Sequence, residues 1–331
     1  MEEKERLSWL SVVRGFTILL VVMAHVQLLN LSTGECYTIC RVLSEPFDAI
    51  RMPLFIFSSG GLLYLSRISK RWNVVCLYAD KARRILIPFV FFVTVYYVVK
   101  ILFASIIKHP IDVSFRSFFE SFYLFEGHAS GPLWFLATLS VLMLLYPLFC
   151  WLLQRKTTAI VGWLFTVFFY FVDPEGLLPD NYFYLLCLNH YLVFFYSGIL
   201  FFRYALYRYI GHVWAFLALL MLYLLLNYFE VPLVTCLVGV AMMVAGGQLV
   251  ARRAEWLFCS FRDYIFQIYL MSFFCQGIVE LVLWPRSGYH EGLFWLFYAL
   301  NILFGLYLPV LFSKVVERCP VRFIRLCFGL K

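Results

Sequence analysis

An arginine and a histidine stand eleven positions apart in the first apolar stretch of the chain, at Arg14 and His25. In a helix, eleven positions return to within about 20° of the starting direction, so the two side chains share one face, about 16 Å apart along the axis. A charge near the centre of a membrane costs on the order of 3 kcal/mol, and such residues normally face a protein interior or a wet cavity. Two interpretations follow. Either Arg14 snorkels and His25 is an interfacial cap, or the pair belongs to an active site inside a membrane bundle.

The elements that position this pair are those of a membrane protein. Of the 331 residues, 63% are hydrophobic and 14% are charged, whereas a soluble domain averages about 45–50% apolar and about 25% charged residues. The ten cysteines are scattered without a paired C-x-x-C motif, so we expect no metal. The net charge of +8 comes without a dense basic run, so we expect membrane lipids and no nucleic acid among the partners.

The sequence predicts an all-α integral membrane protein with about ten transmembrane helices, because each span needs about 20 mostly apolar residues. No hydrophilic stretch is long enough for a soluble domain, so we expect residues 1–331 to form a single polytopic domain. The predicted spans are 8–30, 50–67, 85–107, 131–153, 159–173, 182–202, 213–229, 231–250, 263–284 and 292–313.

Basic residues concentrate on one side of this arrangement. With the amino terminus inside, most of the 27 lysines and arginines fall at the two chain ends and in four joints between spans. Those joints are 67–84, 154–156, 203–208 and 251–253. The positive-inside rule assigns such loops to the cytoplasm. We therefore expect both termini to be cytoplasmic.

Several motifs follow one another along the chain. They are Arg14 with His25, RMPLFIFSSGGL at 51–62, KARRILIP at 81–88, GPLWFL at 131–136 and, more weakly, YIFQIYL at 264–270. Their order and spacing resemble the integral-membrane acyltransferase family 3. Members of that family O-acetylate sugars on polysaccharides, lipid-linked glycans and other cell-envelope acceptors.

The resemblance implies a polytopic membrane acyltransferase domain over residues 1–331, in the cell membrane and by family likeness the bacterial inner membrane. It implies an enzyme that moves an acetyl (acyl) group from cytosolic acetyl-coenzyme A, an acyl-CoA co-substrate, to a hydroxyl of a glycan or lipid-linked sugar. His25 matches the essential histidine of the family and Arg14 matches its partner. The basic joint matches the arginine-containing loop thought to meet acyl-coenzyme A.

The chain departs from the family at two places. The family often has Arg-x-Arg in the basic joint, whereas this chain offers Lys81 and the adjacent Arg83 and Arg84. Which pair meets phosphate is therefore open. Many members follow Tyr-Leu with one residue and a histidine, whereas the Tyr-Leu-Met run of this chain leads to Ser272. Any role of that second histidine is lost or reassigned.

Acyl transfer from a thioester to a hydroxyl needs a base, a positive field for the oxyanion and a positioned donor. A neutral histidine is the usual base, since its unperturbed pKa lies near 6.5. We hypothesise that His25 is the general base for a sugar hydroxyl and that Arg14 fixes donor groups through its rigid fork of donors. A salt bridge between spans is the alternative for Arg14, and a role in the histidine's environment is another.

The cytosolic end offers a place for the donor. Arginine suits phosphate recognition, so we expect Lys81, Arg83 and Arg84 to bind the phosphates of coenzyme A, with membrane anchoring or contact with anionic headgroups as the alternative. By helical rise His25 lies about 27 Å into the span, toward the outer side of a core about 30 Å thick. The coenzyme arm would thread inward from the cytosol while the acceptor reaches His25 from outside.

Three further residues are candidates for the acceptor site. His190 lies in the sixth predicted span and Glu280 in the ninth, and we expect both to line the substrate cavity, with an interspan hydrogen bond as the alternative for Glu280. Trp134 either contacts a sugar or seals the bundle, and packing within the bundle is the favoured interpretation.

Two other functions compete with the enzyme. Ten spans with buried charges also suit a polytopic transporter or flippase for a glycan or small substrate, although the sequence has no repeated halves. A catalytically silent partner in polysaccharide assembly is the third hypothesis. An enzyme consumes acetyl-coenzyme A and releases free thiol, whereas a carrier moves an unmodified sugar. The sequence leaves open the sugar, its hydroxyl, the length of the acyl group and the oligomeric state.

Overall fold

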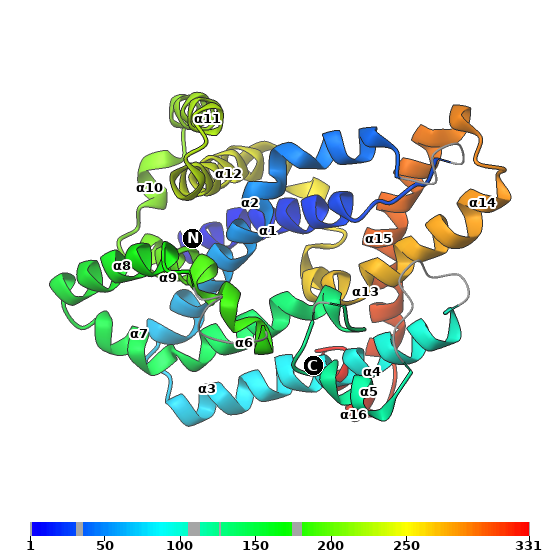
Figure 1. The fold of residues 1–331 in the computed structure, drawn as a ribbon. Coiled ribbons are helices and arrows are strands. Elements are labelled where there is room, and N and C mark those ends of the chain that lie inside the picture. The colour runs from blue at the N-terminus through cyan, green and yellow to red at the C-terminus, as the bar shows by residue number, and fades with distance from the viewer. Residues whose placement is uncertain (1, 31–35, 105–112, 126, 174–180, 331) are drawn as a thin grey trace. The chain divides into compact units, whose positions relative to one another are not determined.

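The regular elements of the computed structural model are helices (Figure 1). The structure describes residues 2–30, 36–104, 113–125, 127–173 and 181–330. Within these residues the β pairing amounts to one isolated bridge, between Leu29 and Cys36. The prediction of an all-α protein is confirmed for the described part of the chain.

The α-helices are α1 (Glu2–Ala24), α2 (Thr38–Leu63), α3 (Val74–Lys81), α4 (Ile87–Leu102), α5 (Phe115–Glu120), α6 (Trp134–Leu144), α7 (Tyr146–Leu152), α8 (Lys156–Tyr170), α9 (Leu188–Arg203), α10 (Tyr207–Ile210), α11 (Val213–Tyr228), α12 (Pro232–Ala254), α13 (Ile265–Ile278), α14 (Trp284–Arg286), α15 (Phe294–Glu317) and α16 (Arg322–Cys327). Three π-helical turns are η1 (Tyr64–Ile68), η2 (Ala82–Leu86) and η7 (Val279–Leu283). The 3₁₀ turns are η3 (Gly131–Leu133), η4 (Tyr182–Cys187), η5 (Glu255–Phe258), η6 (Arg262–Tyr264) and η8 (Glu291–Leu293).

Helices long and apolar enough to cross a membrane occur throughout the described residues. There are six, or seven if one bent pair counts as a single span. The six are Thr38–Ile68, Val74–Leu102, Tyr182–Arg203, Pro232–Phe258, Arg262–Arg286 and Glu291–Glu317, and the bent pair is Gly131–Leu144 with Tyr146–Leu152. The shorter apolar helices Trp9–Ala24, Lys156–Tyr170 and Val213–Tyr228 lie at the three remaining predicted spans. The count of about ten and the side of each terminus stay predictions.

Local sequence explains where several helices begin. Asn73 caps α3, since its side chain accepts a hydrogen bond from the backbone N–H of Val75 at 2.9 Å. Ser114 caps α5 in the same way through the N–H of Ser117, at 3.1 Å. Pro147 lies at the first turn of α7, where its missing N–H ends the preceding helix and suits a new one. This proline accounts for the bend in the fourth predicted span.

The joint predicted at 67–84 differs from the sequence-based expectation. The chain is helical from Val74 and continues through η2 into α4. The Asn73 cap starts this helix well before the apolar run at residue 85. Arg67, Lys81, Arg83 and Arg84 therefore lie on helical turns, whereas Lys70 and Arg71 lie in the turn between η1 and α3.

The described chain divides into two compact units. The first comprises residues 1–59 and 201–315, and the second comprises residues 60–200 and 316–331. The unit boundaries fall inside the continuous helices α2, α9 and α15. The single polytopic domain expected from the sequence stays a prediction.

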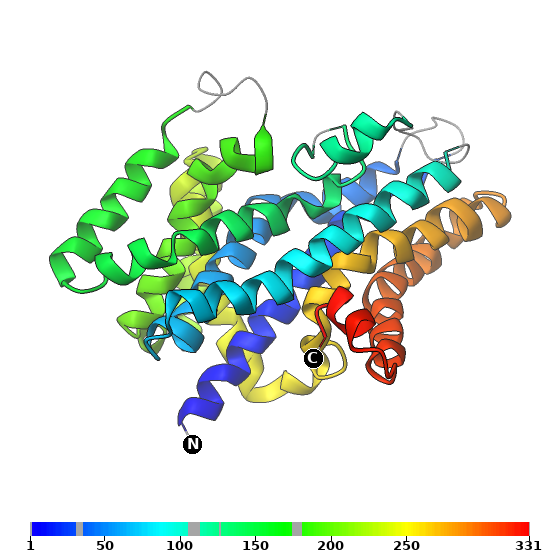
Figure 2. The same cartoon turned by 90° about the horizontal axis from the view of Figure 1, so that it is seen from below.

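In the first unit, α1 packs against α12 and α13, and α12 packs against α11. Gly247 of α12 lies so close to Val13 of α1 that a β-carbon there would overlap the valine side chain. The segment containing η5 and η6, yellow in Figure 2, lies against α1, which is dark blue. Tyr223 of α11 donates a hydrogen bond to the carbonyl of Pro46 in α2 at 2.8 Å. These contacts hold the helix that carries Arg14.

In the second unit, α4 packs against α16 (Figure 1), and α6 packs against η4. Gly60 lies against the backbone of Phe195, so a side chain at this position would collide with the carbonyl of Phe195. The Tyr146 hydroxyl donates to the carbonyl of Trp72 at 2.8 Å, and the Tyr78 hydroxyl donates to the carbonyl of Leu144 at 2.8 Å. These bonds fix the turn between η1 and α3 and the start of the basic segment, by which we mean α3 and η2 with Lys81, Arg83 and Arg84.

Candidate functional site

Arg14 lies within α1 and its side chain is partly buried. In the described part of the chain it makes no ion pair and no hydrogen bond. The salt bridge between spans that the sequence allowed as an alternative is therefore not seen among these residues. An arginine among apolar helices is costly unless an anion or water meets it, so its guanidinium is suited to a ligand.

The first predicted span, 8–30, is longer than the helix that forms there. The helix α1 ends at Ala24, and His25 begins a turn in which its N–H donates to the carbonyl of Val22 at 3.2 Å. The following backbone leaves the helix because other groups take its hydrogen bonds. The N–H of Tyr37 donates to the carbonyl of Leu28 at 3.0 Å, and the indole N–H of Trp284 donates to the carbonyl of Leu29 at 2.8 Å. The shared helical face predicted for Arg14 and His25 therefore stops one residue short of the histidine.

The imidazole of His25 has few polar neighbours. Its Nδ1 is buried and makes no hydrogen bond to any described residue. The ring meets the edge of Phe273 with centroids 6.4 Å apart. The charge of Arg51 in α2 acts on the imidazole, and Arg51 is itself paired with Asp48 at 2.6 Å. The residue pattern does not predict this electrostatic interaction, although Arg51 opens the second motif.

Glu280 lies on the π-helical turn η7 and reaches the segment that follows His25. Its Oε1 accepts hydrogen bonds from the backbone N–H of Gln27 at 2.8 Å and from Nδ2 of Asn301 at 2.8 Å. Nε2 of Gln276 donates to Oδ1 of Asn301 at 2.7 Å and to the carbonyl of Val22 at 2.9 Å. The interspan hydrogen bond considered for Glu280 is present, and its contact with a substrate stays a prediction.

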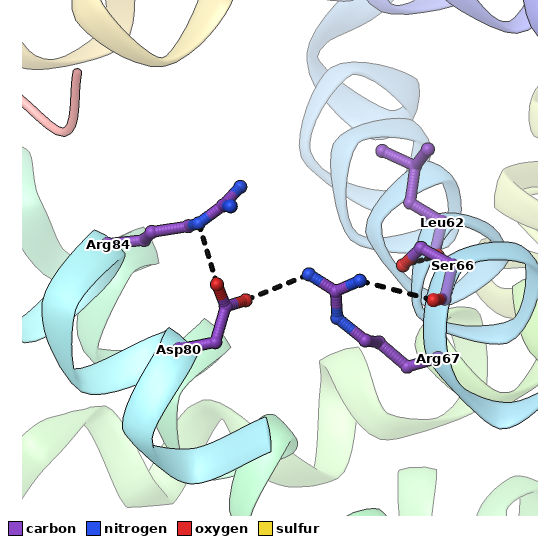
Figure 3. Close-up of polar contacts among 5 residues, drawn as sticks. All are labelled: Leu62, Ser66, Arg67, Asp80 and Arg84. Carbon is purple, nitrogen blue, oxygen red and sulfur yellow. Dashed lines mark hydrogen bonds and ion pairs between the residues drawn. The ribbon is translucent and has the colours of Figure 1, made fainter. Parts of the chain in front are cut away.

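Asp80 organises the basic segment of the second unit (Figure 3). One carboxylate oxygen pairs with Nε of Arg84 at 2.8 Å, and the other pairs with the guanidinium of Arg67 at 2.9 Å. Arg67 also donates to the carbonyl of Ser66 at 3.2 Å and lies 3.5 Å above the ring centre of Trp72. One carboxylate thus fixes two arginines that are 17 positions apart in the sequence.

The three predicted donor residues differ in their surroundings. Arg84 is about half exposed, at 48% of its side chain, and it is the one held by Asp80. Arg83 is exposed and has no ion pair within the described residues, while Lys81 ends α3 and is partly buried. The i,i+4 spacing of Asp80 and Arg84 was a readable signal for this pair. Arg67 had no such signal, since only the tertiary fold brings it to Asp80.

Trp134 and His190 both lie in the second unit, each among aromatic side chains. The indole of Trp134 stacks on Tyr184, with centroids 5.0 Å apart, and meets the tilted ring of Tyr191 at 5.3 Å. His190 is exposed at the start of α9, where its ring meets Tyr170 and its Nδ1 is 2.9 Å from Oδ1 of Asn189. Packing, the interpretation favoured for Trp134, agrees with these stacked rings. The acceptor roles of both residues stay predictions.

The candidate residues fall into two groups. Arg14, His25 and Glu280 belong to the first unit, whereas Lys81, Arg83, Arg84, Trp134 and His190 belong to the second. Glu280, Arg83 and Arg84 lie on π-helical turns, which are rare and frequently mark functional sites. A path that joins both groups for the coenzyme arm stays a prediction.

Comparison with protein families gives a match to the family model described as "Acyltransferase domain" over residues 7–314. The match covers nearly the whole chain, including every candidate residue named above. Comparisons with curated proteins and with solved structures found no match.

The two ion pairs of Asp80 predict unequal energies. Arg67 is largely buried, with 15% of its side chain exposed, so we expect the Asp80–Arg67 pair to show a coupling free energy above about 1 kcal/mol in a double-mutant cycle. The half-exposed Arg84 should couple to Asp80 by less than about 1 kcal/mol. Free energies of unfolding in detergent, measured for the alanine variants, test this. Arg83→Ala is the control with no change expected, and a larger coupling for Arg84 would contradict the account.

Proposed function

This chain belongs to the acyltransferase family 3, and on that premise we propose that it is a membrane O-acyltransferase. It moves an acetyl group from cytosolic acetyl-coenzyme A to a hydroxyl of a cell-envelope sugar, polysaccharide or lipid-linked glycan, as a multi-pass protein of the bacterial inner membrane. The observation that carries the proposal is at the end of α1. There, a buried nitrogen of His25 has no partner among the described residues, and His25 directly follows the helix that carries the unpaired Arg14.

In the proposed reaction, the acceptor hydroxyl oxygen attacks the carbonyl carbon of the thioester while His25 takes the hydroxyl proton. A C–O bond forms, the C–S bond breaks, and the sulfur leaves with its electron pair. The proton passes from His25 to that sulfur, which gives free coenzyme A and an acetyl ester. The positive charge of Arg51, which acts on the imidazole, supports stabilisation of the oxyanion, and Arg14 fixes the donor.

The donor phosphates bind at the basic segment in this proposal. Arg84 uses Nε for Asp80, and its two terminal nitrogens point away from the carboxylate (Figure 3). That leaves a planar, exposed fork of the kind that binds phosphate oxygens in pairs. Arg83 and Lys81 add positive charge on the same turns. Asp80 and Arg67 hold the fork in place.

The acceptor is proposed to meet Glu280, His190 and Trp134. The stack of Trp134 on Tyr184, with Tyr191 tilted against it, presents aromatic faces, which suit the apolar face of a sugar ring. His190, exposed at the start of α9 with its ring against Tyr170, offers a further hydrogen-bonding group in the same unit. These contacts make acceptor choice a property of the residues around the stack.

His25→Ala should lower acetyl-coenzyme A turnover about 100-fold or more, because general-base catalysis contributes about that much. The assay measures thiol release and transfer of radiolabelled acetyl by purified protein in nanodiscs. His212→Ala replaces an exposed histidine at the start of α11 and should keep full activity. Equal turnover of His25→Ala and wild type would rule out His25 as the base. Absence of donor binding and turnover in the wild type would favour the transporter or flippase.

Arg84→Ala should raise KM for acetyl-coenzyme A about tenfold, which corresponds to the loss of about 1.4 kcal/mol, a usual value for a charge-assisted hydrogen bond. With acetyl-pantetheine, which lacks the nucleotide phosphates, the variant and the wild type should have equal KM. Arg155→Ala removes an exposed arginine outside the cluster and serves as the control. An equal loss with both donors would show that Arg84 does not bind those phosphates.

A further inference from the structure

The turn that carries His25 is tied to neighbouring helices on both of its sides. Before the histidine, the carbonyl of Val22 accepts a hydrogen bond from Gln276 at 2.9 Å. After it, the N–H of Gln27 donates to Glu280 at 2.8 Å. Asn301 of α15 joins the two, accepting from Gln276 at 2.7 Å and donating to Glu280 at 2.8 Å. We call Gln276, Asn301 and Glu280 the anchor residues.

Two of the anchor residues, Gln276 and Asn301, are committed to these bonds by burial. Gln276 is 1% exposed and Asn301 is 0% exposed, so an amide released from its partner would find no water in exchange. Both N–H groups of the Gln276 side chain are used, one on Val22 and one on Asn301. Its Oε1 has no donor among the described residues, so the amide is held by its two donated bonds.

Gly305 supplies the space that this arrangement needs. It follows Asn301 by one helical turn on the same face of α15. A β-carbon at this position would lie 2.7 Å from Cγ1 of Val22 and 3.0 Å from both Cγ and Cδ of Gln276. The absence of a side chain therefore lets α1 and Gln276 approach α15 closely. Gln276 and Glu280 are four positions apart and reach the turn from one helical stretch.

The imidazole needs such support from its backbone. A catalytic histidine is often oriented by a hydrogen bond to its second ring nitrogen, but Nδ1 of His25 has none within the described residues. The direction of the ring is then set by the peptide that carries it, by the backbone of Val21, which acts on the imidazole, and by packing against Phe273. Groups that hold the carbonyl of Val22 and the N–H of Gln27 therefore control where the ring points.

We propose that Gln276, Asn301 and Glu280 are positioning residues, which fix the turn so that His25 meets the acceptor hydroxyl at the productive angle. This inference rests on the proposed function, since it requires His25 to be the base. Glu280 acts as a hydrogen-bond acceptor for Gln27 and Asn301, so a neutral carbonyl of equal reach can replace its carboxylate. The anchor residues act through His25 and not on the donor.

The proposal predicts a loss in kcat without a loss in donor binding. Gln276→Met and Asn301→Leu keep the side-chain volume and remove the amides, and each should lower kcat about tenfold or more, as misplacement of a catalytic group does. KM for acetyl-coenzyme A should change less than about twofold. Gln248→Met is the matched control, because Gln248 is a buried glutamine of α12 that donates only to the carbonyl of Tyr207 among the described residues.

Variants of Glu280 distinguish its role as a hydrogen-bond acceptor from a role of its negative charge. Glu280→Leu should be about as slow as Asn301→Leu, whereas Glu280→Gln keeps a carbonyl acceptor and should recover most of the lost kcat. A Glu280→Gln variant as slow as Glu280→Leu would overturn the assignment, because the reaction would then need the carboxylate itself.

Folding is monitored by elution as a single species and by the melting temperature. If Asn301→Leu does not fold, Gln276→Asn replaces it. This variant keeps a buried amide but withdraws it from the carbonyl of Val22 by one methylene. We again expect kcat to fall about tenfold. Full kcat in folded anchor variants, with His25→Ala inactive, would overturn the positioning role and leave the proposed function standing. Full activity of His25→Ala would instead rule out His25 as the base, and the positioning role with it.

Discussion

The structure of the first unit depends on how the backbone carbonyl groups at the carboxyl end of α1 find hydrogen-bond partners among apolar helices. A helix end exposes carbonyls without partners, and in a membrane protein water is not at hand to meet them. Here the amide of Gln276 meets the carbonyl of Val22, and Trp284 meets that of Leu29 two residues beyond Gln27. Because those partners come from α13 and α14, the turn with His25 is placed by tertiary packing and not by the helix that precedes it.

A second constraint governs the cationic segment. Positive charges crowd α3 and η2, and a single carboxylate, Asp80, draws Arg67 and Arg84 together. Asp80 thus pairs with a half-exposed arginine, Arg84, and with a largely buried one, Arg67, which lies over the ring of Trp72. The same carboxylate that stabilises this fold thereby leaves the exposed fork of Arg84 aimed outward. Structural and binding roles are divided between two arginines that share one partner.

The sequence predicted the helical class and the location of most apolar helices, because hydrophobic length is a strong signal. It failed at the end of the first span, where apolar residues continue past Ala24 but side chains from α13 and α14 take the backbone bonds. It named His25 and Arg14 from charge in an apolar run. It missed Gln276 and Asn301, since neutral amides resemble ordinary helix residues. It missed the pairing of Arg67 because its partner Asp80 is 13 positions away and only the tertiary fold joins them.

The central claim is that the anchor residues act on catalysis through His25. A kinetic double-mutant cycle tests it directly, with residual transfer of radiolabelled acetyl measured for His25→Ala, Asn301→Leu and the double variant. The account predicts that the double variant is no slower than His25→Ala alone, because a positioning residue has nothing left to position. A double variant slower by the product of the two single effects would contradict it.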